Sequence, residues 1–118
     1  MNPDALRDFC LSLVQAEETF PFDPELSVFK TTGNGKIFAL TNLRDVPLTV
    51  SLKVDPEDSI SLREEFPDIT PGYHLNKKHW ITIVTGVGVP DDLVQDLIRG
   101  SHDLVRPKTR RAPSAPPA

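Results

Sequence analysis

Apolar residues follow a helical spacing near both ends of the chain. Near the N-terminus they recur every three or four positions, and this predicts one apolar helical face made of Leu6, Phe9, Cys10, Leu13 and Val14. Asn2 can cap this helix, and Pro3 fits its first helical position. A second face begins after Pro90-Asp91-Asp92 and comprises Leu93, Val94, Leu97, Ile98, Leu104 and Val105. Gly100-Ser101 interrupts it, and we expect a loosened or kinked helix there.

The middle of the chain has the period of strands. Residues 48–54 alternate strictly, with Leu48, Val50, Leu52 and Val54 separated by polar residues. Such alternation is typical of an antiparallel sheet with one buried face. Ser27–Thr31 and Lys36–Thr41 flank the Gly-rich segment 32–35, which predicts a hairpin, and residues 42–47 connect to the next strand.

A further helix and strand follow this sheet region. Asp55-Pro56 predicts a helix start with Asp55 as the cap, Leu62 and Phe66 mark its buried side, and Pro67 ends it. Residues 80–85 read as a β-branched strand. The apolar faces of the first and last helices need a common core. We therefore expect an α+β fold in which both helices pack on one face of an antiparallel sheet.

The segment Pro71–Trp80, with the sequence PGYHLNKKHW, concentrates groups that bind ligands. It holds two of the three histidines, the only Trp, the only Tyr and two adjacent lysines. Flat aromatic faces beside hydrogen-bond donors suit a ligand that carries phosphates or bases. The structural alternative is that the aromatic residues plug the core while Lys77 and Lys78 are simply solvated. We expect the ring of Trp80 to be largely buried.

The net charge of the chain limits the kinds of partner that it can bind. The chain carries 13 basic and 17 acidic residues, but Lys108, Arg110 and Arg111 lie in a Pro- and Ala-rich stretch, 107–118, that we expect to be a disordered tail. The domain itself, residues 1–106, then holds 10 basic and 17 acidic residues, a net charge of −7. This balance argues against broad, non-specific binding of nucleic acid, so any such binding needs a local basic patch.

Several classes of chemistry find no support in the sequence. His74 and His79 are five residues apart with lysines between them, which disfavours a metal site. Cys10 lies on the apolar helical face and reads as a packed thiol. No nucleophile motif is present, so we expect no enzyme and no cofactor. No apolar run approaches the ~18–20 residues that cross a bilayer, and a single cysteine suits the cytoplasm. We expect a cytoplasmic monomer.

The order of these elements, with PGYHLNKKHW after the second helix, resembles the MmcQ/YjbR family of small bacterial proteins. The likeness spans residues 1–106 and rests on Val28-Phe29-Lys30, Ile37-Phe38-Ala39-Leu40, Ser51-Leu52-Lys53, Asp55-Pro56-Glu57 and the run from Pro71 to Trp80. The resemblance implies a frataxin-like (CyaY-like) fold and a DNA-binding role through two hairpins, the "double wing".

Two functions follow for one surface. In the first, double-stranded DNA is bound by wings at 33–35 and 42–47. Phosphates would then contact Lys30, Lys36, Lys53, Lys77 and Lys78, whereas sugar or base edges would contact His74, Asn76, His79 and Trp80. In the second, an adaptor module uses the same surface for a protein or a small anionic ligand. The salt dependence of duplex binding separates the two.

Overall fold

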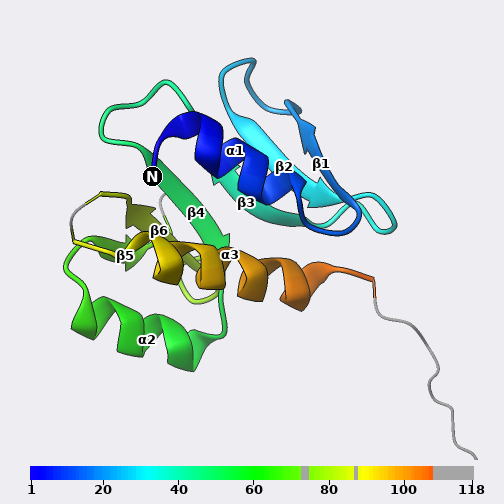
Figure 1. Ribbon diagram of the computed structural model, residues 1–118. Helices are drawn as coiled ribbons and strands as arrows, with labels where there is room; N and C mark the ends of the chain where they lie inside the picture. Colours follow the sequence, from blue (N-terminus) through cyan, green and yellow to red (C-terminus); the bar gives the residue numbers. More distant parts are fainter. Residues whose placement is uncertain (73–74, 87, 108–118) are drawn as a thin grey trace, which may run out of the picture.

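A single antiparallel sheet carries all three helices on one of its faces (Figure 1). The computed structural model describes residues 1–72, 75–86 and 88–107. The strand order is β1-β2-β3-β4-β6-β5, and every neighbouring pair is antiparallel. The elements are α1 (Pro3–Leu11), β1 (Ala16–Thr19), β2 (Ser27–Thr31), β3 (Ile37–Thr41), β4 (Thr49–Lys53), α2 (Pro56–Glu65), β5 (Ile69–Pro71), β6 (Trp80–Val84) and α3 (Asp91–Val105). The expected α+β architecture is confirmed.

The N-terminal helix begins as predicted but ends earlier than its apolar pattern suggests. Asn2 Oδ1 accepts a hydrogen bond of 2.7 Å from the backbone N–H of Ala5, and Leu6 and Cys10 are fully buried. Because α1 ends at Leu11, Val14 no longer lies on the helical face and is 62% exposed. The expectation that Val14 belongs to the buried face is wrong. Burial raises the pKa of the Cys10 thiol to about 12, with a smaller contribution from Glu18, as fits a packed thiol.

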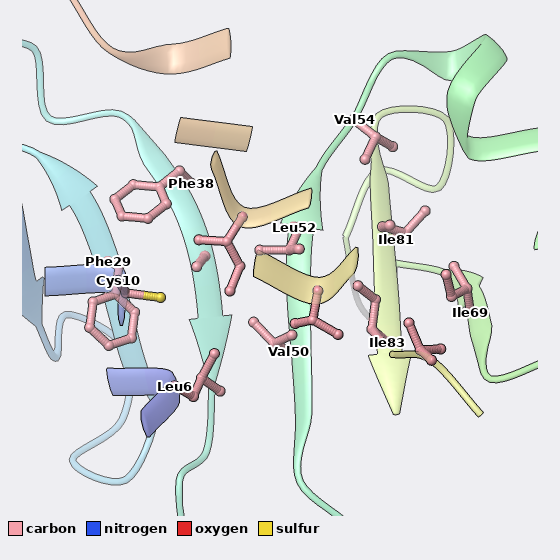
Figure 2. Close-up of a cluster of buried hydrophobic side chains, with 14 of the residues drawn as sticks. Leu6, Cys10, Phe29, Phe38, Val50, Leu52, Val54, Ile69, Ile81 and Ile83 are labelled. Carbon is pink, nitrogen blue, oxygen red and sulfur yellow. The ribbon is translucent and has the colours of Figure 1, made fainter. Parts of the chain in front are cut away.

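A bulge in β3 shapes the core. Lys30 pairs with Ile37 while Phe29 pairs with Ala39, so Phe38 is an extra residue in the ladder. The bulge lets two successive residues, Phe38 and Ala39, both enter the core, where each is fully buried. Figure 2 shows Phe38 beside Phe29, with Val50 and Leu52 on β4 and Ile81 and Ile83 on β6. The Phe38 ring also meets the buried His102 of α3 edge-on at 5.1 Å.

The last helix is continuous, contrary to the expected loosening at Gly100-Ser101. The Ser101 hydroxyl is buried and donates to the Phe38 carbonyl at 2.6 Å, and it accepts from the Lys53 N–H at 2.9 Å. The β3–β4 register runs Leu40↔Ser51 and Ala39↔Leu52, so its next rung would join Phe38 to Lys53. The Ser101 hydroxyl is inserted at this rung and satisfies both backbone groups, which explains a polar residue on the packed side of α3.

The second helix differs from expectation in its cap. Asp55 occupies the N-cap position but makes no side-chain hydrogen bond there. Leu62 and Phe66 pack against the core as predicted, although both are only half-buried. At the end of α3, Leu104 is 52% exposed, so its assignment to the buried face is also wrong. The edge strands β1 and β5 are not predicted by the sequence pattern.

The second face of the sheet is not covered by a helix. Cross-strand partners point to the same side, so Val28, Leu40, Ser51 and Thr82 share this open face. Ser51 Oγ and Thr82 Oγ1 are hydrogen-bonded at 2.9 Å. The face is therefore polar at its centre, whereas the helix-covered face is apolar.

Candidate nucleic-acid interface

The PGYHLNKKHW segment is the connection of the β5–β6 hairpin. Pro71 ends β5 and Trp80 begins β6, and the Gly72 N–H donates to the Trp80 carbonyl at 2.8 Å. A Cβ at Gly72 would stand 2.6 Å from the Trp80 Cβ, so only glycine allows this close approach. The His79 carbonyl accepts from the Val54 N–H at 2.8 Å and ties the loop to the end of β4. Tyr73 and the predicted site residue His74 lie outside the described residues.

The described part of this loop is held by its own polar groups. Asn76 Oδ1 accepts from the Lys78 N–H at 2.9 Å, and the Asn76 carbonyl accepts from the His79 N–H at 3.2 Å. Lys77 Nζ donates to the Gly72 carbonyl at 3.3 Å. Asn76 thus shapes the turn, and its contact with a base stays a prediction, while Lys77, Lys78 and His79 are exposed.

The register brings all five described lysines to one end of the sheet. Lys30 lies near the end of β2, and Lys36 directly precedes its neighbour β3. Lys53 is the last residue of β4 and pairs with Trp80, the first residue of β6. Lys77 and Lys78 lie in the loop just before Trp80. We call this side of the molecule, which the β4 arrowhead marks in Figure 1, the lysine end.

Two of these lysines share the open face with the tryptophan. Lys30 and Lys53 alternate with buried residues of β2 and β4, and Trp80 is the cross-strand partner of Lys53. Trp80 is half-buried and does not belong to the core cluster. The expected burial of Trp80 is therefore met only in part, since the side chain is partly covered but lies outside the core cluster. Trp80 begins the strand as predicted, but its register directs it away from the helices.

The lysines differ from the arginines in their pairing. Four arginines are ion-paired within the molecule: Arg7 with Glu18, Arg44 with Glu25, Arg99 with Asp96 and Arg106 with Asp103. Among the described residues, no ion pair involves Lys30, Lys36, Lys53, Lys77 or Lys78. Arg63, the fifth described arginine, has no ion pair and donates to the Ser59 hydroxyl at 3.1 Å. Of the six described Lys and Arg side chains without an ion pair, five therefore lie at the lysine end.

The two hairpins predicted as wings lie at opposite ends of β3. The tip at 32–36 is at the lysine end, but it is docked on the body. Asn34 Nδ2 donates to the Val105 carbonyl at 2.8 Å, and a Cβ at Gly33 would come within 2.7 Å of Pro107. The 42–48 connection is at the other end, where Val46 is 95% exposed. Because β3 separates them, the two hairpins do not flank one surface.

In the part of the chain that the structure describes, no three His, Cys, Asp or Glu side chains gather to hold a metal ion. No helix found there has the length and apolarity to cross a bilayer.

Comparison with known proteins places the chain among relatives of similar size. The family model described as YjbR matches residues 11–104. The chain is 43% identical to Escherichia coli O157:H7 YbdF over 103 residues, 86% of this chain and 82% of that protein. It is 29% identical to YjbR of E. coli K12 over 102 residues, with 86% and 85% covered.

Solved structures give the same fold. A Deinococcus radiodurans protein with a DUF419 domain superposes with a TM-score of 0.82 and 47% identity, covering 87% of this chain and 77% of that one. A Pseudomonas syringae protein superposes with a TM-score of 0.79 and 30% identity, covering 90% of this chain and all 100% of that one. Sequence and structure thus point to one group of proteins.

Proposed function

Because this chain belongs to the YjbR family and its free positive charge gathers at one end of the sheet, we propose that it binds DNA through the lysine end, without catalysing a reaction. Phosphate contacts supply most of the affinity of such proteins and require cations that are not already neutralised. The observation that carries the proposal is the contrast in ion pairing: four of the five described arginines are ion-paired within the molecule, and none of the five described lysines is.

The acidic body is compatible with this proposal. Its net charge is −7, but binding depends on the local field within about one Debye length, roughly 8–10 Å at physiological salt. Neighbouring strands are about 4.8 Å apart, so β2, β3, β4 and β6 present their lysines across a width of ~15 Å. Lysines spread over this width can contact several phosphates of one DNA strand. The basic residues of the tail, Lys108, Arg110 and Arg111, follow Pro107, which lies against Gly33 at the same end.

In this proposal only one of the two hairpins contacts DNA, whereas a double wing would use both. The docked tip at 32–36 supplies Lys36, and the 42–48 connection contributes no phosphate contact because it lies at the opposite end of β3. Trp80, half-buried beside Lys53, offers a flat face for a sugar or base.

The test is the salt dependence of binding to a labelled 20-base-pair duplex. If the five lysines each neutralise one phosphate, log affinity should fall against log salt with a slope of roughly −4 to −5. Lys77→Ala with Lys78→Ala should flatten this slope by about 2 and weaken binding equally for unrelated sequences.

Arg44→Ala with Arg99→Ala provides a matched control. It also removes two positive charges, but both belong to arginines that are ion-paired within the molecule. The slope should then change by less than about 0.5. Equal slopes in wild type and the Lys77/Lys78 variant reject the proposal, as does a wild type that fails to bind at ~50 mM salt. The adaptor or anionic-ligand function would then be pursued.

A further inference from the structure

A groove lies between α2 and α3 on the helix-covered face of the sheet. α3 packs on β3 and β4, whereas α2 packs on β5 and β6, so the two helices cover neighbouring parts of this face (Figure 1). The groove has a volume of about 380 Å³, within the ~300–1,000 Å³ typical of small-ligand sites. Its lining combines a covered apolar floor with exposed carboxylates at the rim: Val54, Leu62 and Leu97, and Asp55, Asp58 and Asp96.

The groove is acidic, and two of its carboxylates are unpaired. Asp96 Oδ1 accepts from Arg99 Nη1 at 2.7 Å. Asp55 and Asp58 form no ion pair with any described residue, and Asp55 makes no side-chain hydrogen bond at the start of α2. Lys53 is the only cation among the described residues of the lining, against three carboxylates. An acidic rim above an apolar floor suits a segment of chain that carries both cations and apolar groups.

The C-terminal tail carries such groups and leaves the fold close to this groove. Leu104 lines the groove and is 52% exposed, and α3 ends at the next residue, Val105. Pro107 lies against Gly33 at the lysine end, the end at which β4 stops two residues before Asp55. Beyond Pro107 the sequence continues with three cations and then with apolar residues: Lys108, Arg110 and Arg111, followed by Ala112 and Pro113.

The tail is long enough to reach the unpaired carboxylates. The Ser101 hydroxyl of α3 accepts from the Lys53 N–H at 2.9 Å, so the start of the connection to Asp55 lies beside α3. Ser101 is four residues before the end of the helix, about 6 Å along its axis. An extended chain spans ~3.3–3.6 Å per residue, so the chain from Pro107 to the two arginines covers ~10–14 Å before the length of their side chains is added. The basic residues can therefore meet Asp55 and Asp58.

We propose that the groove between α2 and α3 binds the chain's own C-terminal tail, with the basic residues of the tail at the carboxylates of Asp55 and Asp58. The aliphatic stems of these basic side chains then lie over Leu104 and the apolar floor. Exposed ion pairs are individually weak, but a tethered ligand acts at an effective concentration in the millimolar range, so a few weak contacts suffice. The inference does not rest on the proposed DNA binding, which counts only the five lysines outside the tail.

A nitroxide on the tail reports where the tail lies. Ser114→Cys provides the attachment point in the full chain, and Cys10 stays unlabelled because it is buried and burial raises the pKa of its thiol to about 12. ¹H–¹⁵N spectra are recorded at ~50 mM salt, where ion pairs are weakly screened, with the nitroxide first oxidised and then reduced. We expect the oxidised nitroxide to attenuate the amide signals of Leu62 and Gly100, which line the groove, more than that of Gly35 in the docked hairpin tip.

Two variants separate a docked tail from one that is merely tethered nearby. Asp55→Asn with Asp58→Asn keeps a capping residue at the start of α2 but removes both unpaired charges, and it should reduce the attenuation at the groove by about twofold or more. Glu64→Gln with Glu65→Gln removes two exposed charges from the same helix outside the groove and should leave the attenuation unchanged. Equal attenuation in both variants overturns the inference, as does equal attenuation at the groove and at the hairpin tip in the chain without these substitutions.

A mixed sample tests the other occupants. Nitroxide-labelled chain at natural isotope abundance is mixed with ¹⁵N-labelled chain that carries no nitroxide, and the proposal predicts no attenuation in the ¹⁵N-labelled chain. Attenuation there would assign the groove to the tail of a second copy and overturn the intramolecular contact. Absence of attenuation in both experiments also overturns the proposal and leaves the groove to a basic segment of another protein. None of these measurements involves DNA, so their outcome is independent of the proposed function.

Discussion

The two ends of the sheet carry similar kinds of residue but differ in what those residues are bonded to. At the lysine end, Lys36, Lys53 and Lys78 have no ion pair among the described residues, and the loops there are fixed by backbone and amide hydrogen bonds. At the opposite end, Arg44 lies 3.6 Å from Glu25. An external anion would therefore encounter unpaired lysines at one end and, at the other, an arginine already paired with a carboxylate.

In this account, the ion pairing of individual side chains matters more for binding an anion than the net charge of the chain. An acidic total of −4 disfavours polyanion binding when charge is averaged over the chain. The fold places unpaired lysines close together, because the pairing of β4 with β6 puts Lys53 beside Trp80 and beside the loop that precedes Trp80. Substitutions can break or sharpen this difference between the ends.

The largest expected effect is at the serine that completes the lysine end. Ser101→Ala removes the hydroxyl that bonds both the Phe38 carbonyl and the Lys53 N–H. Leaving two buried backbone groups without a partner should lower the free energy of unfolding by about 3 kcal/mol, measured by urea denaturation. At the other end, Thr85→Val removes only one of two bonds to the Leu48 carbonyl, because the Thr85 N–H also donates to it. The expected cost there is about 1 kcal/mol. Equal costs would contradict the special role of Ser101.

A smaller effect is expected at the base of the lysine loop. In Gly72→Ala the new methyl group would overlap the Trp80 Cβ, so the loop must shift, at a cost of about 2 kcal/mol. Thermal unfolding measures this cost. Gly100→Ala is the control, because a Cβ at Gly100 meets nothing within 4 Å and alanine suits a helix interior. A lower melting temperature in both variants, or in neither, would show that the contact with Trp80 does not fix the loop.

The smallest effects separate charge from stability. Arg44→Ala should cost at most about 0.5 kcal/mol, as exposed ion pairs contribute little, and Lys78→Ala should change stability by no more than that. Only Lys78→Ala should weaken DNA binding. If Lys78→Ala destabilises the domain by more than ~1 kcal/mol, the lysine has a structural partner, and its proposed role at the surface is wrong.

Sequence alone predicts the elements whose burial alternates. Residues 48–54 identify β4 because one face is apolar and the other polar. The sequence does not predict β1, because the helix-covered side of this strand carries Glu18 where an apolar residue would be expected. The Glu18 carboxylate accepts hydrogen bonds from Arg7 and Ser27 there. The three residues of β5 are too few to show a period.

The candidate site depends on contacts that local pattern cannot reveal. The lysines were identified as candidates by type, but their convergence follows from the pairing of β4 with β6, which are separated along the chain by α2 and β5. The kink expected at Gly100-Ser101 is based on helix propensity alone. The two hydrogen bonds from the Ser101 hydroxyl to β3 and β4 outweigh that propensity and keep the helix continuous.

The most direct test of the central claim is a map of the surface that contacts DNA. Two-dimensional ¹H–¹⁵N spectra are recorded as the protein is titrated with a short duplex at ~50 mM salt. The account predicts that the largest shifts fall on the backbone amides of Lys36, Lys53, Lys77 and Lys78 and on the Trp80 indole, while residues 42–48 remain unchanged. Shifts centred on Arg44 and Val46, or a spectrum that does not change at all, would contradict it.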